Sequence, residues 1–314
     1  MTRFVPAVLV VLWSSGFVGA TLAAQSAPAE TTLLWRYVVA VVPLCGWALW
    51  ARRRYGARFL ARESLIGILG QGGYLLGVFR AADLGVLPGT SALVASLQPP
   101  LVALLLWAGS GGRTDRRQSV GLLTGLVGVL LVVGGDLGGA GGSAGLAAVG
   151  LGMLSLTAAT LVAARWTQPE GHGVADSLVV QSLVALCFFA AVAVATGTAA
   201  PPRDADFWLA VAWLVLLAFV GGYGSYLYVL RTSGPVVVSA WLYLTPATAA
   251  VWAWPMFGEP LTVRAAAGFL VAAAGVTAVV RPRRPASRDP LVRARRWSPA
   301  GDRRDRAGTL LSQP

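Results

Sequence analysis

Long apolar stretches alternate with short polar links along most of the chain. Each of the ten stretches that can be counted is about 20 residues long, which is the length a helix needs to cross the hydrocarbon core of a bilayer. The pattern therefore predicts ten transmembrane helices. They are expected at residues 4–24, 31–50, 64–81, 88–108, 119–135, 144–164, 175–197, 207–229, 234–257 and 262–280.

Arginine follows every second apolar stretch. The link of residues 51–63 alone holds five arginines, and the tail from residue 281 onward holds ten arginines and three aspartates. The links after the first, fifth, seventh and ninth stretches hold five acidic residues, with only Arg203 and Arg264 as clear basic members. Because positive charge concentrates in cytoplasmic loops, this alternation predicts that both termini are cytoplasmic. Residues 281–314, rich in Pro, Arg, Asp and Ser, are expected to be a disordered basic tail.

Two segments of the chain are copies of each other. Residues 97–134 and 244–281 align without a gap at an offset of 147 residues, and 12 of the 38 aligned positions are identical. The duplication predicts a first repeat at residues 1–135 and a second at residues 144–280. Five helices per repeat is an odd number, so the second copy enters the membrane in the opposite orientation. The expected fold is thus an all-α integral membrane protein with ten transmembrane helices in two inverted five-helix repeats, an architecture in which transporters bind substrate between the repeats.

The composition excludes several classes of protein. With 56% hydrophobic and 12% charged residues among 314, the chain would expose too much apolar surface as a soluble protein, so the lipid bilayer is its expected environment. The net charge of +12 lies largely in the tail, and no folded basic module points to nucleic acid. His172 is the single histidine, and Cys45 and Cys187 lie apart in apolar stretches, so we expect no metal site and no cofactor.

Short motifs in both halves carry a family resemblance. They are LWSSGF at residues 12–17, WRY at residues 35–37, and GEPLT at residues 258–262, whose glutamate has Gly112 as its counterpart in the first repeat. With these motifs in this order, the chain resembles the EamA family of the drug/metabolite transporter superfamily. The resemblance implies a ten-helix, inverted-repeat carrier that moves small metabolites by alternating access, in many members by export.

Polar and aromatic side chains within the apolar stretches form the candidate substrate site. Ser96 and Gln98 correspond to Tyr243 and Thr245 at the offset of the repeat. Aromatic walls with neutral hydrogen-bonding groups suit a neutral or zwitterionic small molecule, such as an amino acid-like or drug-like compound. The alternative for each residue is an interhelical hydrogen bond that holds the bundle together. The predicted substrate-binding residues are Trp13, Ser14, Gln71, Tyr74, Ser96, Gln98, Tyr223, Tyr226, Trp241, Tyr243 and Thr245.

Three further residues are predicted to act in transport. Pro99 and Pro246 lie in the middle of the fourth and ninth stretches, where proline breaks a helical hydrogen bond and can serve as a hinge or as a static kink. Arg36 either reaches the outer surface near Glu30 or points inward and attracts a substrate carboxylate. Because Asp and Glu are missing from the centre of every predicted stretch, we expect a facilitator or exchanger, or coupling through water and Arg36.

Other interpretations remain open at this point. A GxxxG motif at residues 121–125 predicts a close helix contact, either within the protein or in a homodimer. Residues 3–27 also resemble a signal peptide cleaved near Ala24, although cleavage would remove the first helix of the repeat. The expected function is export of a small molecule across the cytoplasmic membrane. The alternatives are a non-transporting assembly or sensor protein on a carrier fold, and an integral membrane enzyme, which the missing clusters of catalytic side chains disfavour.

Overall fold

The computed structural model describes residues 4–109, 142–167 and 169–258, together with single positions between 119 and 127 and between 263 and 275. These residues form helices and no strands, which confirms the predicted all-α class. Within them, six helical stretches are long and apolar enough to cross a membrane. They are Val5–Ala24, Ala29–Trp50, Ala57–Asp83, Gly142–Arg165, Val174–Ala195 and Ala205–Ser233.

The same order of helices occurs twice along the described chain. The elements of the first half are α1 (Val5–Ala24), α2 (Ala29–Trp50), α3 (Ala57–Gly67), η1 (Ile68–Gly73), α4 (Tyr74–Asp83), α5 (Pro88–Ala95) and α6 (Gln98–Gly109). Those of the second half are α8 (Gly142–Arg165), α9 (Val174–Ala195), α10 (Ala205–Trp213), η2 (Leu214–Tyr223), α11 (Gly224–Ser233), α12 (Pro235–Leu242) and α13 (Thr245–Phe257). The predicted fifth and tenth helices, with the 121–125 motif, lie largely outside the described residues, so the ten-helix count and the inverted orientation stay predictions.

Both halves contain the same two irregularities. The third span of each half passes through a π-helical segment, η1 or η2, and π-helical turns occur often at functional sites. The fourth span is broken in two, and the starts of its pieces, Pro88 with Pro235 and Gln98 with Thr245, are 147 residues apart. In η1 the carbonyl of Leu69 accepts a hydrogen bond of 2.8 Å from Ser155 Oγ of α8, which satisfies the backbone away from water.

The breaks change the interpretation of the two prolines. The chain turns tightly before each of them, with hydrogen bonds of 3.1 Å from Leu97 N to Val94 O and of 3.0 Å from Leu244 N to Trp241 O. Pro99 and Pro246 therefore lie in the first turn of α6 and α13, where a missing N–H breaks no helical hydrogen bond. The expected mid-helix position was wrong, because the sequence pattern does not show that each fourth span is two helices.

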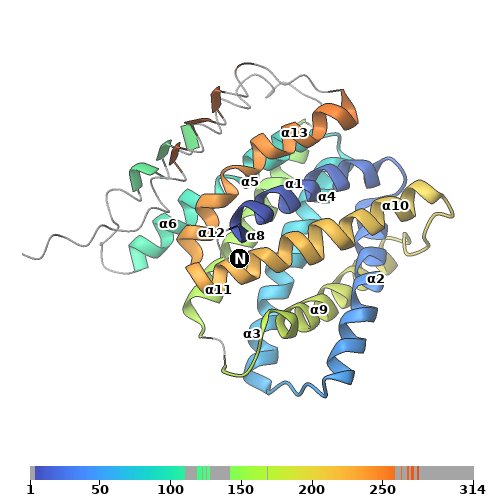
Figure 1. The fold of residues 1–314 in the computed structure, drawn as a ribbon. Coiled ribbons are helices and arrows are strands. Elements are labelled where there is room, and N and C mark those ends of the chain that lie inside the picture. The colour runs from blue at the N-terminus through green and yellow to red at the C-terminus, as the bar shows by residue number, and fades with distance from the viewer. Residues whose placement is uncertain are drawn as a thin grey trace, which may run out of the picture. The chain divides into compact units, whose positions relative to one another are not determined.

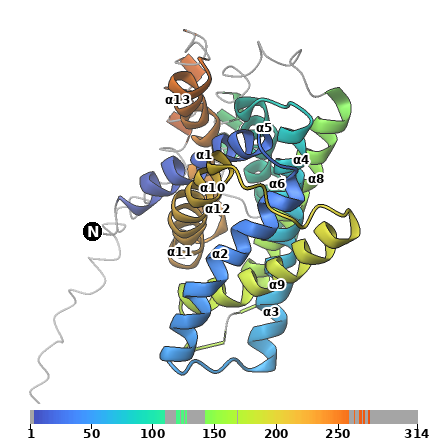
Figure 2. The same cartoon turned by 90° about the vertical axis from the view of Figure 1, so that its right-hand side faces the viewer.

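The helices pack so that their links gather at two ends. Both views show α2, α3 and α9 side by side, and α1 packs along η2 (Figure 1, Figure 2). We call the end with the α2–α3 and α8–α9 links and the C-terminus of α11 the arginine end, because Arg53, Arg62 and Arg231 lie there. The opposite end, with Glu30 and Asp83, is the acidic end. Many apolar side chains face outward between the two ends, with Val42 69% and Leu216 65% exposed, as expected for contact with lipid.

The helices α4 and α8 cross with their backbones in close contact. A Cβ at Gly77 would lie 2.4 Å from Ala148 O, and a Cβ at Gly152 would lie 2.8 Å from Tyr74 O. Only glycine permits these backbones to approach so closely. The crossing holds the helix that carries Tyr74 against the second half of the chain.

We predict that Gly152→Val destabilises the folded protein. The added side chain must push α8 away from α4, and overpacking of this kind costs about 1–3 kcal/mol. The measurement is the thermal unfolding midpoint of the detergent-purified chain. Gly150→Val is the matched control, since a Cβ at Gly150 on the same helix meets no atom within 4 Å. Equal midpoints for the two variants would contradict the prediction.

Candidate substrate cavity and polar network

A small cavity lies in the middle of the bundle. Its walls come from α1, α2, η1, α4 and η2, and its volume is about 30 Å³, room for water but not for a metabolite. The polar and aromatic residues that line it are Trp13, Arg36, Gln71, Tyr74 and Tyr223. Substrate binding at this place therefore requires the helices to move apart.

Aromatic rings form one wall of the central cavity. The ring of Trp13 lies 5.8 Å from that of Tyr74, 6.2 Å from that of Tyr223 and 5.0 Å from that of Tyr226. The hydroxyl of Tyr226 also lies 2.7 Å from Thr160 Oγ1, so that α1, α4, α8, η2 and α11 meet at this cluster. Such rings offer flat apolar surface and attract cations over their faces.

Arg36 reaches into the same cavity from α2. Its side chain is buried, and its guanidinium carbon lies 5.5 Å from the ring centre of Tyr37 and 5.8 Å from that of Phe219. Among the described residues Arg36 forms no ion pair, and its Nε has no hydrogen-bond partner. Of the two alternatives for Arg36, the inward position is the one found, because Glu30 pairs with Arg80 instead.

The acidic end of the bundle is closed by polar contacts between its links. Glu30 pairs with Arg80, and the Asp83 carboxylate accepts a 2.8 Å hydrogen bond from the backbone N–H of Ala29. Two side chains of α2 donate to the link after α9, at 2.6 Å from Thr31 Oγ1 to Thr198 O and at 3.0 Å from the Trp35 indole to Ala199 O. Arg80 also lies within 3.9 Å of the Asp83 carboxylate, one turn further along α4.

A second cavity opens at the arginine end. It has a volume of about 510 Å³, and its exposed rim includes Thr167, Glu170 and Arg231. Its inner wall includes Glu63 and Gln181, both fully buried. The described conformation is thus closed at the acidic end and open at the arginine end.

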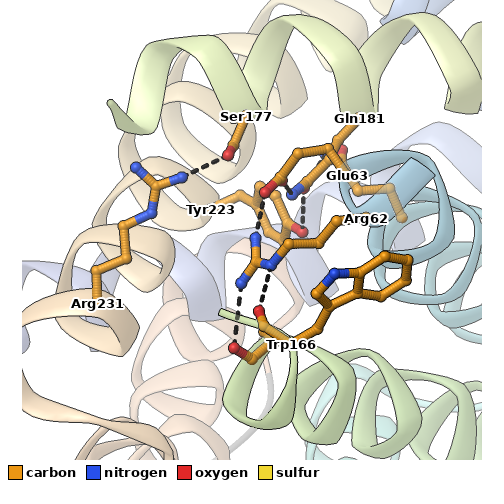
Figure 3. A network of polar contacts seen from close by, with 9 residues as sticks. Arg62, Glu63, Trp166, Ser177, Gln181, Tyr223 and Arg231 are labelled. Atoms are coloured by element: carbon orange, nitrogen blue, oxygen red, sulfur yellow. Dashed lines mark hydrogen bonds and ion pairs between the residues drawn. The ribbon is translucent and has the colours of Figure 1, made fainter. Parts of the chain in front are cut away.

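A network of buried polar side chains connects the two cavities (Figure 3). Glu63 accepts hydrogen bonds from Arg62 and, at 2.5 Å, from Gln181 Nε2. Gln181 Oε1 in turn accepts from the hydroxyl of Tyr223 at 2.7 Å and from Gln71 Nε2 at 3.3 Å. The network therefore begins at Glu63, on the wall of the arginine-end cavity, and ends at two residues that line the central cavity.

Close packing of α3 on α9 makes this network possible. A Cβ at Gly67, one turn after Glu63, would lie 2.9 Å from Gln181 Cα. Glycine at this position lets α9 approach until the amide of Gln181 reaches the carboxylate. Tyr37 of α2 extends the network, because its hydroxyl donates to Gln71 Oε1.

An ion pair joins the two links at the arginine end. Arg53 donates two hydrogen bonds of 2.6 Å to the carboxylate of Asp176 and one of 2.8 Å to Gly171 O. Asp176 also accepts a 2.7 Å bond from the backbone N–H of Gly173, which caps α9. The hydrogen bonds to Asp176 raise the pKa of Arg53, while burial raises the pKa of the neighbouring Tyr55 to about 12. Arg53 thus stays charged and Tyr55 neutral near pH 7.

The sequence-predicted site residues divide into two groups. Trp13, Gln71, Tyr74 and Tyr223 line the central cavity, and Tyr226 stacks beside them. The remaining members, which do not line this cavity in the described conformation, are Ser14, Ser96, Gln98, Trp241, Tyr243 and Thr245.

Several members of the second group make local contacts. Ser14 and Ser96 donate to carbonyls of their own helices, and Gln98 Nε2 donates to Thr160 Oγ1 at 3.1 Å. The hydroxyls of Tyr243 and Thr245 are buried without a hydrogen-bond partner. Those two groups are available to a ligand or to another conformation of the bundle.

The sequence prediction missed Glu63, Gln181 and Tyr37. Glu63 was excluded because the third stretch was expected to begin at residue 64, whereas the helix begins at Ala57 and carries the glutamate within the span. Gln181 could have been found as a lone amide in the very apolar α9. Tyr37 is part of the WRY motif at residues 35–37, but that motif was used only for the family resemblance.

We predict that Asp176→Asn loosens the arginine end. The substitution removes the ion pair with Arg53, while an asparagine oxygen can still accept from the N–H of Gly173. Hydrogen–deuterium exchange in peptides covering residues 166–176 should become faster, and high salt should reduce the difference from wild type because Arg53 is partly exposed. Asp204→Asn, at the exposed start of α10, is the control. Unchanged exchange would show that the pair does not hold these links.

Comparison with known proteins shows a family similarity in the second half of the chain. Residues 144–281 match the EamA-like transporter family, which confirms the predicted resemblance for this part of the chain. Two relatives, the "Uncharacterized inner membrane transporter YedA" of Escherichia coli strains K12 and O157:H7, are each 25% identical over 260 residues, covering 81% of this chain and 82% of the relative.

The fold also has a counterpart among solved structures. One crystal structure is similar with a TM-score of 0.70, covering 94% of this chain and 98% of the other, at 19% identity. A likeness at this identity shows the fold alone. The family match and the helical membrane spans together lead to one conclusion: the second half of the chain, at residues 144–281, is similar to the EamA-like transporter family and lies in a helical membrane protein.

Proposed function

We propose that the chain is a secondary transporter of the cytoplasmic membrane that moves a small zwitterionic or neutral metabolite by alternating access. The duplicated sequence, the paired π-helical segments and the paired breaks support two inverted five-helix repeats around the central cavity. An even number of spans would then put both termini on the side of the arginine-rich links, which the distribution of positive charge predicts to be the cytoplasm. The family resemblance favours export.

The observation that carries this proposal is Arg36 in the aromatic cavity. An unpaired guanidinium within a membrane bundle is costly to bury, so it needs a partner that the described residues do not supply. A substrate carboxylate would supply it, and the rings of Trp13, Tyr74 and Tyr223 would hold the organic part and any ammonium group. Of the predicted substrate classes, a zwitterion fits these groups better than a neutral molecule.

The described conformation fits one state of such a cycle. The arginine end is open and the acidic end is closed by the Glu30–Arg80 and Asp83 contacts. With the arginine end in the cytoplasm, this state faces inward. Transport then requires the contacts at the acidic end to break while the arginine end closes.

We predict that Arg36→Gln abolishes recognition of carboxylates. Three probes of similar shape separate the charges: L-phenylalanine carries both, 3-phenylpropionate only the carboxylate, and phenethylamine only the ammonium group. Wild type should bind the first two, and Arg36→Gln should weaken both by at least about 30-fold, since truncating one partner of a buried charge pair costs about 2 kcal/mol or more.

The measurement for Arg36 is calorimetric binding to the detergent-purified chain, followed by counterflow in proteoliposomes. Arg58→Gln, which removes an exposed arginine, is the control and should bind as wild type does. Equal binding of phenethylamine and L-phenylalanine would contradict a carboxylate site at Arg36. Binding without counterflow would favour the non-transporting sensor.

We also predict that Pro246→Ala slows transport without weakening binding. Proline prevents α12 and α13 from joining into one helix, and alanine at this position would stiffen the break and oppose its movement. Turnover in counterflow should fall while the affinity for L-phenylalanine stays the same. Pro255→Ala, at an exposed position of the same helix, is the control. Unchanged turnover in Pro246→Ala would remove the hinge role of this proline.

A further inference from the structure

Glu63 is a buried carboxylate inside a membrane span that the proposed transport cycle does not yet use. It lies on α3 within the span Ala57–Asp83 and is fully shielded from solvent. A charged carboxylate at such a place is stable only with close partners, and ionisable residues inside membrane bundles often carry protons. Glu63 also borders the arginine-end cavity, so a small movement of its neighbours would bring the carboxylate into contact with water.

Arg62, the charged partner of Glu63, has other hydrogen-bond acceptors as well. Arg62 pairs with Glu63 but also donates to Trp166 O at 2.6 Å and to Ala163 O at 3.1 Å (Figure 3). These carbonyls belong to the C-terminal end of α8, which carries partial negative charge. Arg62 therefore keeps two hydrogen bonds to carbonyls when Glu63 becomes neutral, although its ion pair with Glu63 is lost.

The hydrogen bonds of the network all point toward Glu63. Tyr37 donates to Gln71, Gln71 donates to Gln181, Tyr223 donates to Gln181, and Gln181 donates to Glu63. An ionised carboxylate enforces this direction because it can only accept. A protonated Glu63 can donate to Gln181 instead. Rotation of the amides of Gln71 and Gln181 then exchanges donor and acceptor at each hydrogen bond of the network.

The reversed hydrogen bonds change which groups in the central cavity can donate to a substrate. The amide of Gln181 would donate to the oxygen of Tyr223, which frees the hydroxyl hydrogen of Tyr223 for the cavity that it lines with Arg36. Loss of the negative charge at Glu63 also makes the region more positive. Both effects favour a substrate carboxylate.

We infer that Glu63 is a proton-binding site whose protonation accompanies substrate binding in the central cavity. In this step the carboxylate of Glu63 takes one proton from a hydronium ion in the arginine-end cavity: one O–H bond of the hydronium ion breaks, one O–H bond forms on the carboxylate, and a water molecule is left behind. The inference rests on the proposed transport function. Export would then carry a proton outward with each substrate, driven by accumulated substrate, whereas an inward proton gradient would drive uptake.

Other charged and titratable groups around Glu63 define the controls. Arg62 adjoins it on α3, Tyr223 is linked to it through Gln181, and further groups share the arginine-end cavity. Those further groups are Glu170, His172 and Arg231. Glu170 is exposed on the rim of this cavity, so Glu170→Gln removes a carboxylate of the same kind without touching the network.

A first experiment tests proton binding without substrate. Infrared difference spectra of the purified full chain between acidic and alkaline conditions should contain a carboxyl C=O band that Glu63→Gln lacks and Glu170→Gln retains. Thermal unfolding confirms that each variant is folded. If the spectra of wild type and Glu63→Gln are the same, Glu63 does not titrate and the inference is overturned, while the proposed transport function is unaffected.

A second experiment tests coupling to the cavity. Adding L-phenylalanine to wild type in weakly buffered solution should take up protons, reported by a pH dye, and its affinity should fall as pH rises. Glu63→Gln should bind L-phenylalanine with no proton uptake and no pH dependence. Gln181→Leu should keep the infrared band but lose the proton uptake, because the hydrogen-bond network between Glu63 and the central cavity is interrupted. Glu170→Gln should behave as wild type.

The outcomes separate the two proposals. Binding of L-phenylalanine with proton release, or with no proton movement, would overturn the coupling and leave the carrier function intact. Failure of wild type to bind any of the three phenyl probes would overturn the proposed substrate class and with it the coupling. The infrared experiment would then still decide whether Glu63 binds a proton.

Discussion

The interior of a membrane protein offers polar side chains no water, so each buried charge must be satisfied by the protein itself. This constraint explains the network around Glu63. A carboxylate, two amides and two tyrosine hydroxyls from five helical segments satisfy one another, and the backbone carbonyls at the end of α8 hold Arg62. The same constraint makes Arg36 conspicuous, because its guanidinium has aromatic neighbours and no described carboxylate.

The irregular helical segments that occur in both halves position the polar groups of the central cavity. Gln71 lies in η1 and Tyr223 in η2, so that each π-helical segment supplies one polar group to the central cavity. The broken fourth spans put Pro99 and Pro246 at the starts of short helices rather than inside long ones. Irregular backbone inside a membrane is stable where protein covers it, which is the case here for the Leu69 carbonyl bonded to Ser155.

The two ends of the bundle differ, because one is closed by contacts between its links and the other opens into a cavity. The acidic end is closed by ion pairs and backbone contacts, and the arginine end is open, with the Arg53–Asp176 pair fixing its links. Contacts of this kind are individually modest, which suits the proposed transport cycle, in which they would break and re-form. The network through Glu63 spans the distance between the open cavity and the central one.

Much of this protein followed from its sequence alone. The apolar stretches and the family motifs were enough to predict the helical membrane class and the family similarity found for residues 144–281. Hydropathy and short motifs can be read directly from the order of residues. Among the candidate site residues, Trp13, Gln71, Tyr74 and Tyr223 could be chosen because polar and aromatic groups are conspicuous in apolar helices. Only the tertiary structure decided that Glu63 lies within a span, that Gln181 meets it across the α3–α9 contact at Gly67, and that Arg36 points inward. Those facts depend on where helices begin and how they cross, and packing between distant segments sets both.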